Sequence, residues 1–76
     1  MKYIIFEKFE CIGYPVIFPK FINHCDIAQQ IGHKPLSAGE CSIGDDGKVH
    51  CFGYSHTLKL HCNEGDEDLI NSAWGI

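Results

Sequence analysis

The chain has 76 residues, a formal charge of −4 at pH 7, and six lysines but no arginine. A chain of this length forms one domain, here residues 1–76, near the lower size limit for an independent core. The scattered lysines exclude the basic patch that nucleic acids need, so no direct nucleic-acid binding is expected. No stretch approaches the roughly 20 apolar residues of a membrane span. Glu7 and Lys8 also interrupt the apolar start, so it does not read as a signal peptide.

The first half of the chain predicts a β-hairpin followed by a short helix. Residues 2–6 are β-branched or aromatic and predict a strand. Residues 16–18 lie between two prolines, which indicates a short strand at the edge of a sheet. Asn23 is a suitable cap for a helix over 23–31, and Gly32 follows its last apolar residue as a stop signal.

Residues 36–62 predict the central hairpin. A three-residue loop at 45–47 with Gly47 in the left-handed position sets Cys41 opposite Cys51 and Ile43 opposite Val49. These four side chains then share one face of the hairpin. We expect a bulge or bend at Gly53, after which the second strand resumes over residues 57–62.

A second helix is predicted over residues 63–74, with Asn63 as its cap. Four acidic residues crowd its first turns, where the helix dipole favours negative charge: Glu64, Asp66, Glu67 and Asp68. Trp74 is either a lid on the core or a contact for a partner. The elements together predict an α+β fold, a small antiparallel sheet of four to five strands with two short helices packed on it.

Five cysteines and five histidines raise the question of a metal site, because His-Cys occurs three times in the chain. The sequence has no Cys-x-x-Cys pair, and adjacent residues of a strand point to opposite faces. We therefore predict no metal ligands and no cofactor. A small Cys/His metal-stabilised structural module without catalytic activity is the alternative interpretation.

The cysteines are expected to be reduced, because an odd number without an export signal favours free thiols. A disulfide between Cys41 and Cys51 across the hairpin is conceivable but is expected to be strained. A cysteine nucleophile would need an orienting acid and an oxyanion hole, and the sequence indicates neither. We therefore do not expect an enzyme.

Aromatic residues are numerous for so small a core. If Cys51 points inward, Phe52 points to the other face of the sheet, and Tyr54 follows the bend. In a two-layer domain that face stays open unless a partner or a second copy covers it, and the alternative is that the second helix covers it. The pattern predicts a binding protein, with a homodimer as one form of it.

Several segments together resemble a group of short uncharacterised phage and prophage proteins: 16–19, His24 before a helix, 35–39, 47–55, 58–60 and the acidic last helix. The resemblance implies action in the cytoplasm of a bacterial host and brings no catalytic residues. Small acidic phage proteins of this kind often bind and block a host machine, anti-CRISPR proteins among them. We therefore expect contact with a host protein or protein complex. The predicted contact residues are Glu64, Asp66, Glu67, Asp68, Trp74, Phe52 and Tyr54.

Overall fold

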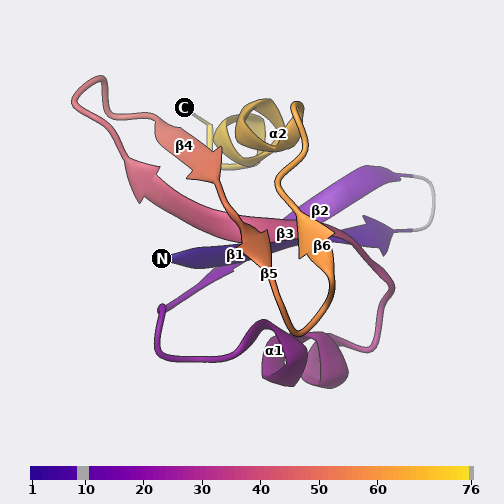
Figure 1. The fold of residues 1–76 in the computed structure, drawn as a ribbon. Coiled ribbons are helices and arrows are strands. Elements are labelled where there is room, and N and C mark those ends of the chain that lie inside the picture. Colours follow the sequence, from indigo (N-terminus) through magenta and orange to yellow (C-terminus); the bar gives the residue numbers. More distant parts are fainter. Residues whose placement is uncertain (9–10, 76) are drawn as a thin grey trace.

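The computed structural model describes residues 1–8 and 11–75 (Figure 1). Its elements, in chain order, are β1 (Lys2–Lys8), β2 (Cys11–Phe18), α1 (His24–Ile31), β3 (Pro35–Ile43), β4 (Val49–Phe52), β5 (Tyr54–Ser55), β6 (Leu60–His61) and α2 (Asp66–Ala73). Strands β2-β1-β3-β4 form an antiparallel sheet in that order, and β5 and β6 form a separate two-stranded ribbon. The predicted α+β class is confirmed.

The two helices lie on opposite faces of the four-stranded sheet (Figure 1). Alternation along β1 sends Tyr3 and Ile5 to the face that carries Ile70 of α2. It sends Ile4 and Phe6 to the other face, where the apolar side chains of α1 and of the β5–β6 ribbon pack. The sequence left one face of the sheet open unless a partner, a second copy or the second helix covers it, and in the structure each face carries one helix.

The predicted register of the central hairpin is confirmed. Cys41 lies opposite Cys51 and Ile43 opposite Val49. The Gly44 N–H donates to the Lys48 carbonyl at 2.9 Å, which closes the loop. Gly47 has φ of 79°, the left-handed conformation that this loop requires.

The predicted strand over 57–62 is wrong for its first half, because only Leu60–His61 are extended. Gly53 has φ of 77° and turns the chain out of β4, which confirms the expected bend. The Ser55 hydroxyl then accepts the Leu58 N–H at 3.3 Å, and Lys59 has φ of 56°. This local hydrogen bonding favours a turn over a strand, and the turn places Leu58 against the α1 side of the sheet.

The structure contains both predicted helices, and the second one is shorter than predicted. Helix α1 begins after Asn23 and ends at Gly32, which has φ of 77° and donates its N–H to the Ala28 carbonyl. Helix α2 begins at Asp66 rather than at Asn63. The Asp66 N–H donates to the Asn63 carbonyl at 3.1 Å, so residues 63–65 form a turn that precedes the helix.

Strand β2 occupies one edge of the sheet, as predicted, although it is longer than residues 16–18. Met1 and Cys41 exchange backbone hydrogen bonds in both directions, at 3.2 and 2.8 Å. Backbone groups of alternate residues in a strand face the same neighbour, so Ile5, like Met1, directs its N–H and C=O toward β3. Ile5 therefore makes no backbone hydrogen bond to Pro15, its partner in β2. The Pro15 nitrogen consequently points to the outer edge of the sheet. A proline fits there because no ladder hydrogen bond is lost.

Candidate functional site

The structure divides the predicted contact residues between the two faces of the sheet. Glu64, Glu67, Asp68 and Trp74 belong to α2 and its flanks. Phe52 of β4 lies opposite Glu40 of β3, and paired residues share a face of the sheet. Glu40 is two residues from Ala38, whose side chain packs on the α1 side, and residues two apart in a strand point to the same face. Phe52 therefore lies on the α1 side. These residues therefore do not form one continuous surface.

Asp66 is not a surface residue, and its prediction as a partner contact is wrong. Its side chain is 5% exposed. It accepts the Tyr3 hydroxyl at 2.5 Å on Oδ2 and the Ser37 hydroxyl at 3.0 Å on Oδ1. The Asn63 N–H also donates to Oδ2 at 3.0 Å. The carboxylate is buried because these three donors replace its water.

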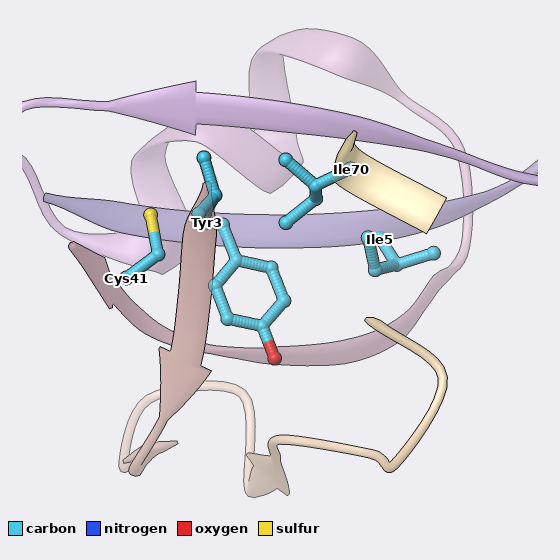
Figure 2. Packing of buried hydrophobic residues seen from close by; sticks show 5 residues of the cluster. Tyr3, Ile5, Cys41 and Ile70 are labelled. Carbon is cyan, nitrogen blue, oxygen red and sulfur yellow. The ribbon is translucent and has the colours of Figure 1, made fainter. Parts of the chain in front are cut away.

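This buried network joins the start of α2 to the centre of the sheet. Figure 2 shows the Tyr3 ring between Cys41 and Ile5, below Ile70 of α2. Burial, and then the hydrogen bond to Asp66, raises the pKa of the Tyr3 hydroxyl, so Tyr3 acts as a neutral donor. The sequence held one signal for this contact, because a tyrosine in an apolar strand needs a hydrogen-bond partner.

Glu67 is only partly available to a partner. Its Oε1 accepts the Cys51 N–H at 2.7 Å, and its Oε2 lies 3.7 Å from Nδ1 of His50. Asn71, one turn further along α2, accepts the Val49 N–H at 2.9 Å and donates to the Val49 carbonyl at 3.1 Å. Two side chains of α2 thus form hydrogen bonds with the outward-facing backbone groups of the edge strand β4. The sequence did not predict this role.

The remaining acidic residues and Trp74 are exposed. Glu64 and Asp68 lie in or next to the first turn of α2, and both are exposed. Trp74 is 49% exposed at the C-terminal end of the helix. Asp68 also lines a groove of about 590 Å³ between α2 and the β2 edge, whose other lining residues are uncharged: Gly13, Tyr14, Pro15, Gly65, Leu69, Ser72 and Ala73.

The second exposed surface lies where β4 continues into β5. Phe52 is 49% exposed and Tyr54 is 56% exposed. The Tyr54 ring contacts the His56 ring edge to face at 4.6 Å between centroids. Tyr54, His56 and Glu40 also line a hollow of about 240 Å³ together with Lys2, Asn23, His24, Ser55 and Thr57. Aromatic and charged groups thus meet at this surface.

The histidines of the three His-Cys pairs have separate partners. Buried His24 donates from Nε2 to the Gly39 carbonyl at 2.9 Å, and burial lowers its pKa. His50 lies 3.2 Å from Oδ1 of Asp46, and His61 donates from Nδ1 to the Cys62 carbonyl. Among residues 1–8 and 11–75, no group of three or more His, Cys, Asp or Glu side chains is arranged to hold a metal ion.

The thiols of the central hairpin are not activated. Burial raises the pKa of Cys51 to about 12, with smaller contributions from Cys41, Cys62, Asp66 and Glu67. Burial also raises the pKa of Cys41. A thiol with a raised pKa is a weak nucleophile at neutral pH, so neither cysteine is suited to nucleophilic catalysis there.

Comparisons with protein-family models, with curated proteins and with solved structures found no match to this chain. In the part of the chain that the structure describes, neither helix is long and apolar enough to cross a membrane.

Proposed function

We propose that this chain acts by binding another protein, as a phage-type accessory protein in the cytoplasm of a bacterial host. Its proposed target is a host defence complex such as a CRISPR effector. The observation that carries this proposal is the half-exposed pair Phe52 and Tyr54, at 49% and 56%. Large aromatic side chains held on a sheet are the residues that most often anchor protein interfaces.

The aromatic surface is rigidly supported. Phe52 closes β4 directly beside Glu40 of β3. Gly53 then turns the chain so that Tyr54 begins β5, whose next residue, Ser55, is buried. A side chain on a paired strand loses less freedom on binding than one on a loop, which favours its use as an anchor.

The exposed acids of α2 take a separate part in this proposal. Glu64 and Asp68 lie on the opposite side of the sheet from Phe52, so one flat partner surface does not reach both. The chain has a net charge of −4, and these exposed carboxylates attract a basic partner over a distance rather than anchor it. The chemistry of the thiols supports the same class of function, because the raised pKa of Cys51 disfavours covalent catalysis.

The test is an interference assay in bacteria that carry a CRISPR effector targeting a reporter phage. Expression of the native chain should raise plaque formation, and Phe52→Ala with Tyr54→Ala should abolish that effect. Phe21→Ala is the matched control, because Phe21 is 83% exposed in the turn before α1 and lies outside the proposed surface.

Binding is then measured with purified effector complexes, and sedimentation of the chain alone reports whether a second copy occupies the aromatic surface instead. Association with an effector that requires Phe52 and Tyr54 supports the proposal. It is overturned if no effector tested binds the native chain and interference is unchanged, or if the double variant acts like the Phe21 control.

A further inference from the structure

Cys41 and Cys51 lie directly opposite each other on neighbouring strands and point to the same face of the sheet. Both pack in the cluster beneath α2, together with Tyr3, Val49 and Ile70. Cys41 is 1% exposed, while Cys51 is partly exposed. Cys51 is therefore the more exposed residue of the pair.

The hydrogen bonds of α2 show which kind of cross-strand pair this is. The Val49 N–H donates to Asn71 and the Cys51 N–H donates to Glu67, so these groups point away from β3. Cys41 and Cys51 consequently form a non-hydrogen-bonded pair, in which opposite Cα atoms lie about 4.5 Å apart and side chains are closest. That spacing falls within the range of roughly 4.4–6.8 Å that disulfides span.

We propose that Cys41 and Cys51 are a site of reversible oxidation, at which a small disulfide such as glutathione disulfide converts the two thiols into a bond that joins β3 to β4. In a non-hydrogen-bonded pair the opposite side chains are closer than in a hydrogen-bonded pair, and the observed register places Cys41 and Cys51 in such a pair.

The reaction has two exchange steps. The Cys51 thiolate attacks glutathione disulfide, which forms a mixed disulfide and releases one glutathione thiolate. The Cys41 thiolate then attacks the Cys51 sulfur, which forms the Cys41–Cys51 bond and releases the second glutathione. The protein loses two electrons and two protons, and glutathione disulfide takes them up as two thiols. Cys51 reacts first because Cys41 is enclosed.

The bridge would act on the edge strand and not on the sheet as a whole. It fixes β4 to β3 one residue before Phe52, and the bond of Glu67 to the Cys51 N–H is compatible with it because that N–H points outward. The inference does not depend on the proposed function, since the same bridge forms whether or not Phe52 contacts a partner.

The test uses a variant that retains only Cys41 and Cys51, with Cys11→Ser, Cys25→Ser and Cys62→Ser. It is incubated with glutathione disulfide at alkaline pH, because burial raises the pKa of both remaining thiols. The monomer should lose the mass of two hydrogen atoms, a peptide map should join Cys41 to Cys51, and dithiothreitol should reverse the change. The oxidised form should also unfold at a higher denaturant concentration than the reduced form.

The matched control retains Cys25 and Cys51, which lie on opposite sides of the sheet, and should yield glutathione adducts without an internal bridge. If the first variant does not fold, the native chain is oxidised and its disulfides are mapped. The proposal is overturned if the monomer gains only glutathione, if bridges join different chains, or if the native chain pairs other cysteines.

Discussion

The two edges of the sheet are closed in different ways. At the β2 edge, Pro15 turns a nitrogen without a hydrogen to the outside, so the strand itself lacks a donor at that point. At the β4 edge, the donors are present, and the side chains of Asn71 and Glu67 bind them from α2. Unprotected edges are sites of uncontrolled pairing between chains, and both devices oppose it.

The β2 edge is protected by a residue of its own strand, whereas the β4 edge is protected by residues of α2 that are distant from it in the sequence. Pro15 acts within its own strand and needs no other element. Asn71 is 22 residues from Val49 in the chain, and its contact exists only while α2 is docked on the sheet. We infer that the β4 edge depends on everything that holds α2 in place, and that the β2 edge does not.

The largest effect is expected from removal of the carboxylate that anchors α2. Asp66→Ala leaves the hydroxyls of Tyr3 and Ser37 buried without an acceptor, so the free energy of unfolding should fall by about 3 kcal/mol or more. Chemical denaturation measures this change. Asp68→Ala, on the exposed side of the same helix, should change stability by less than about 0.5 kcal/mol. Equal effects of the two variants would refute a special role for Asp66.

A smaller loss is expected at the β4 edge itself. Asn71→Ala removes both hydrogen bonds to the Val49 backbone and should cost about 2 kcal/mol. Amide exchange should accelerate at Val49, while exchange at Val16 in β2, whose N–H faces β1, is unchanged. Ser72→Ala, at an exposed position of the same helix, is the control. If exchange accelerates equally at both edges, the β4 edge is not held by this contact.

High pH should also loosen the β4 side of the sheet. In the folded chain, burial raises the pKa of the Cys51 thiol to about 12, whereas the pKa of the unfolded thiol is about 9.0. The contribution of the Cys51 thiol to the free energy of unfolding is therefore fully present below about pH 9 and is lost as pH rises through the folded value, by up to about 4 kcal/mol for the difference between 9.0 and about 12. Unfolding measured across this range should show the decline, and Cys51→Ser should weaken it. A flat profile in the native chain would contradict the burial of this thiol.

The smallest effect on stability is expected at the β2 edge. Pro15→Ala should change the free energy of unfolding by less than about 0.5 kcal/mol, because no contact with α2 is lost through its nitrogen. It adds an outward donor, so the average mass in sedimentation should rise with concentration more steeply than for the native chain. An unchanged mass would mean that Pro15 does not protect this edge.

The sequence predicted the features that depend on neighbouring residues. Gly47 fixed the loop of the central hairpin and therefore the pairing of Cys41 with Cys51. Asn23 and Gly32 marked the ends of α1, and the prolines around residues 16–18 marked an edge strand. Each of these depends on backbone conformation within a few residues.

The features that the sequence did not predict depend on contacts between distant segments. An acid at the start of a helix has the same pattern whether it faces water or a buried tyrosine, so Asp66 was placed on the surface. The alternation at 57–62 indicated a strand, but the Ser55 hydroxyl stabilises a turn there. The division of Phe52 from the α2 acids followed only when each helix was seen to cover its own face of the sheet.

Amide hydrogen exchange of the native chain, measured by NMR, tests the protection of the β4 edge most directly. The account predicts slow exchange at Val49 and Cys51, whose outward N–H groups are bound by α2, and fast exchange at Ile17, whose N–H points outward from β2. Exchange at Val49 and Cys51 as fast as at Ile17 would contradict it, because α2 would then not close the β4 edge in solution.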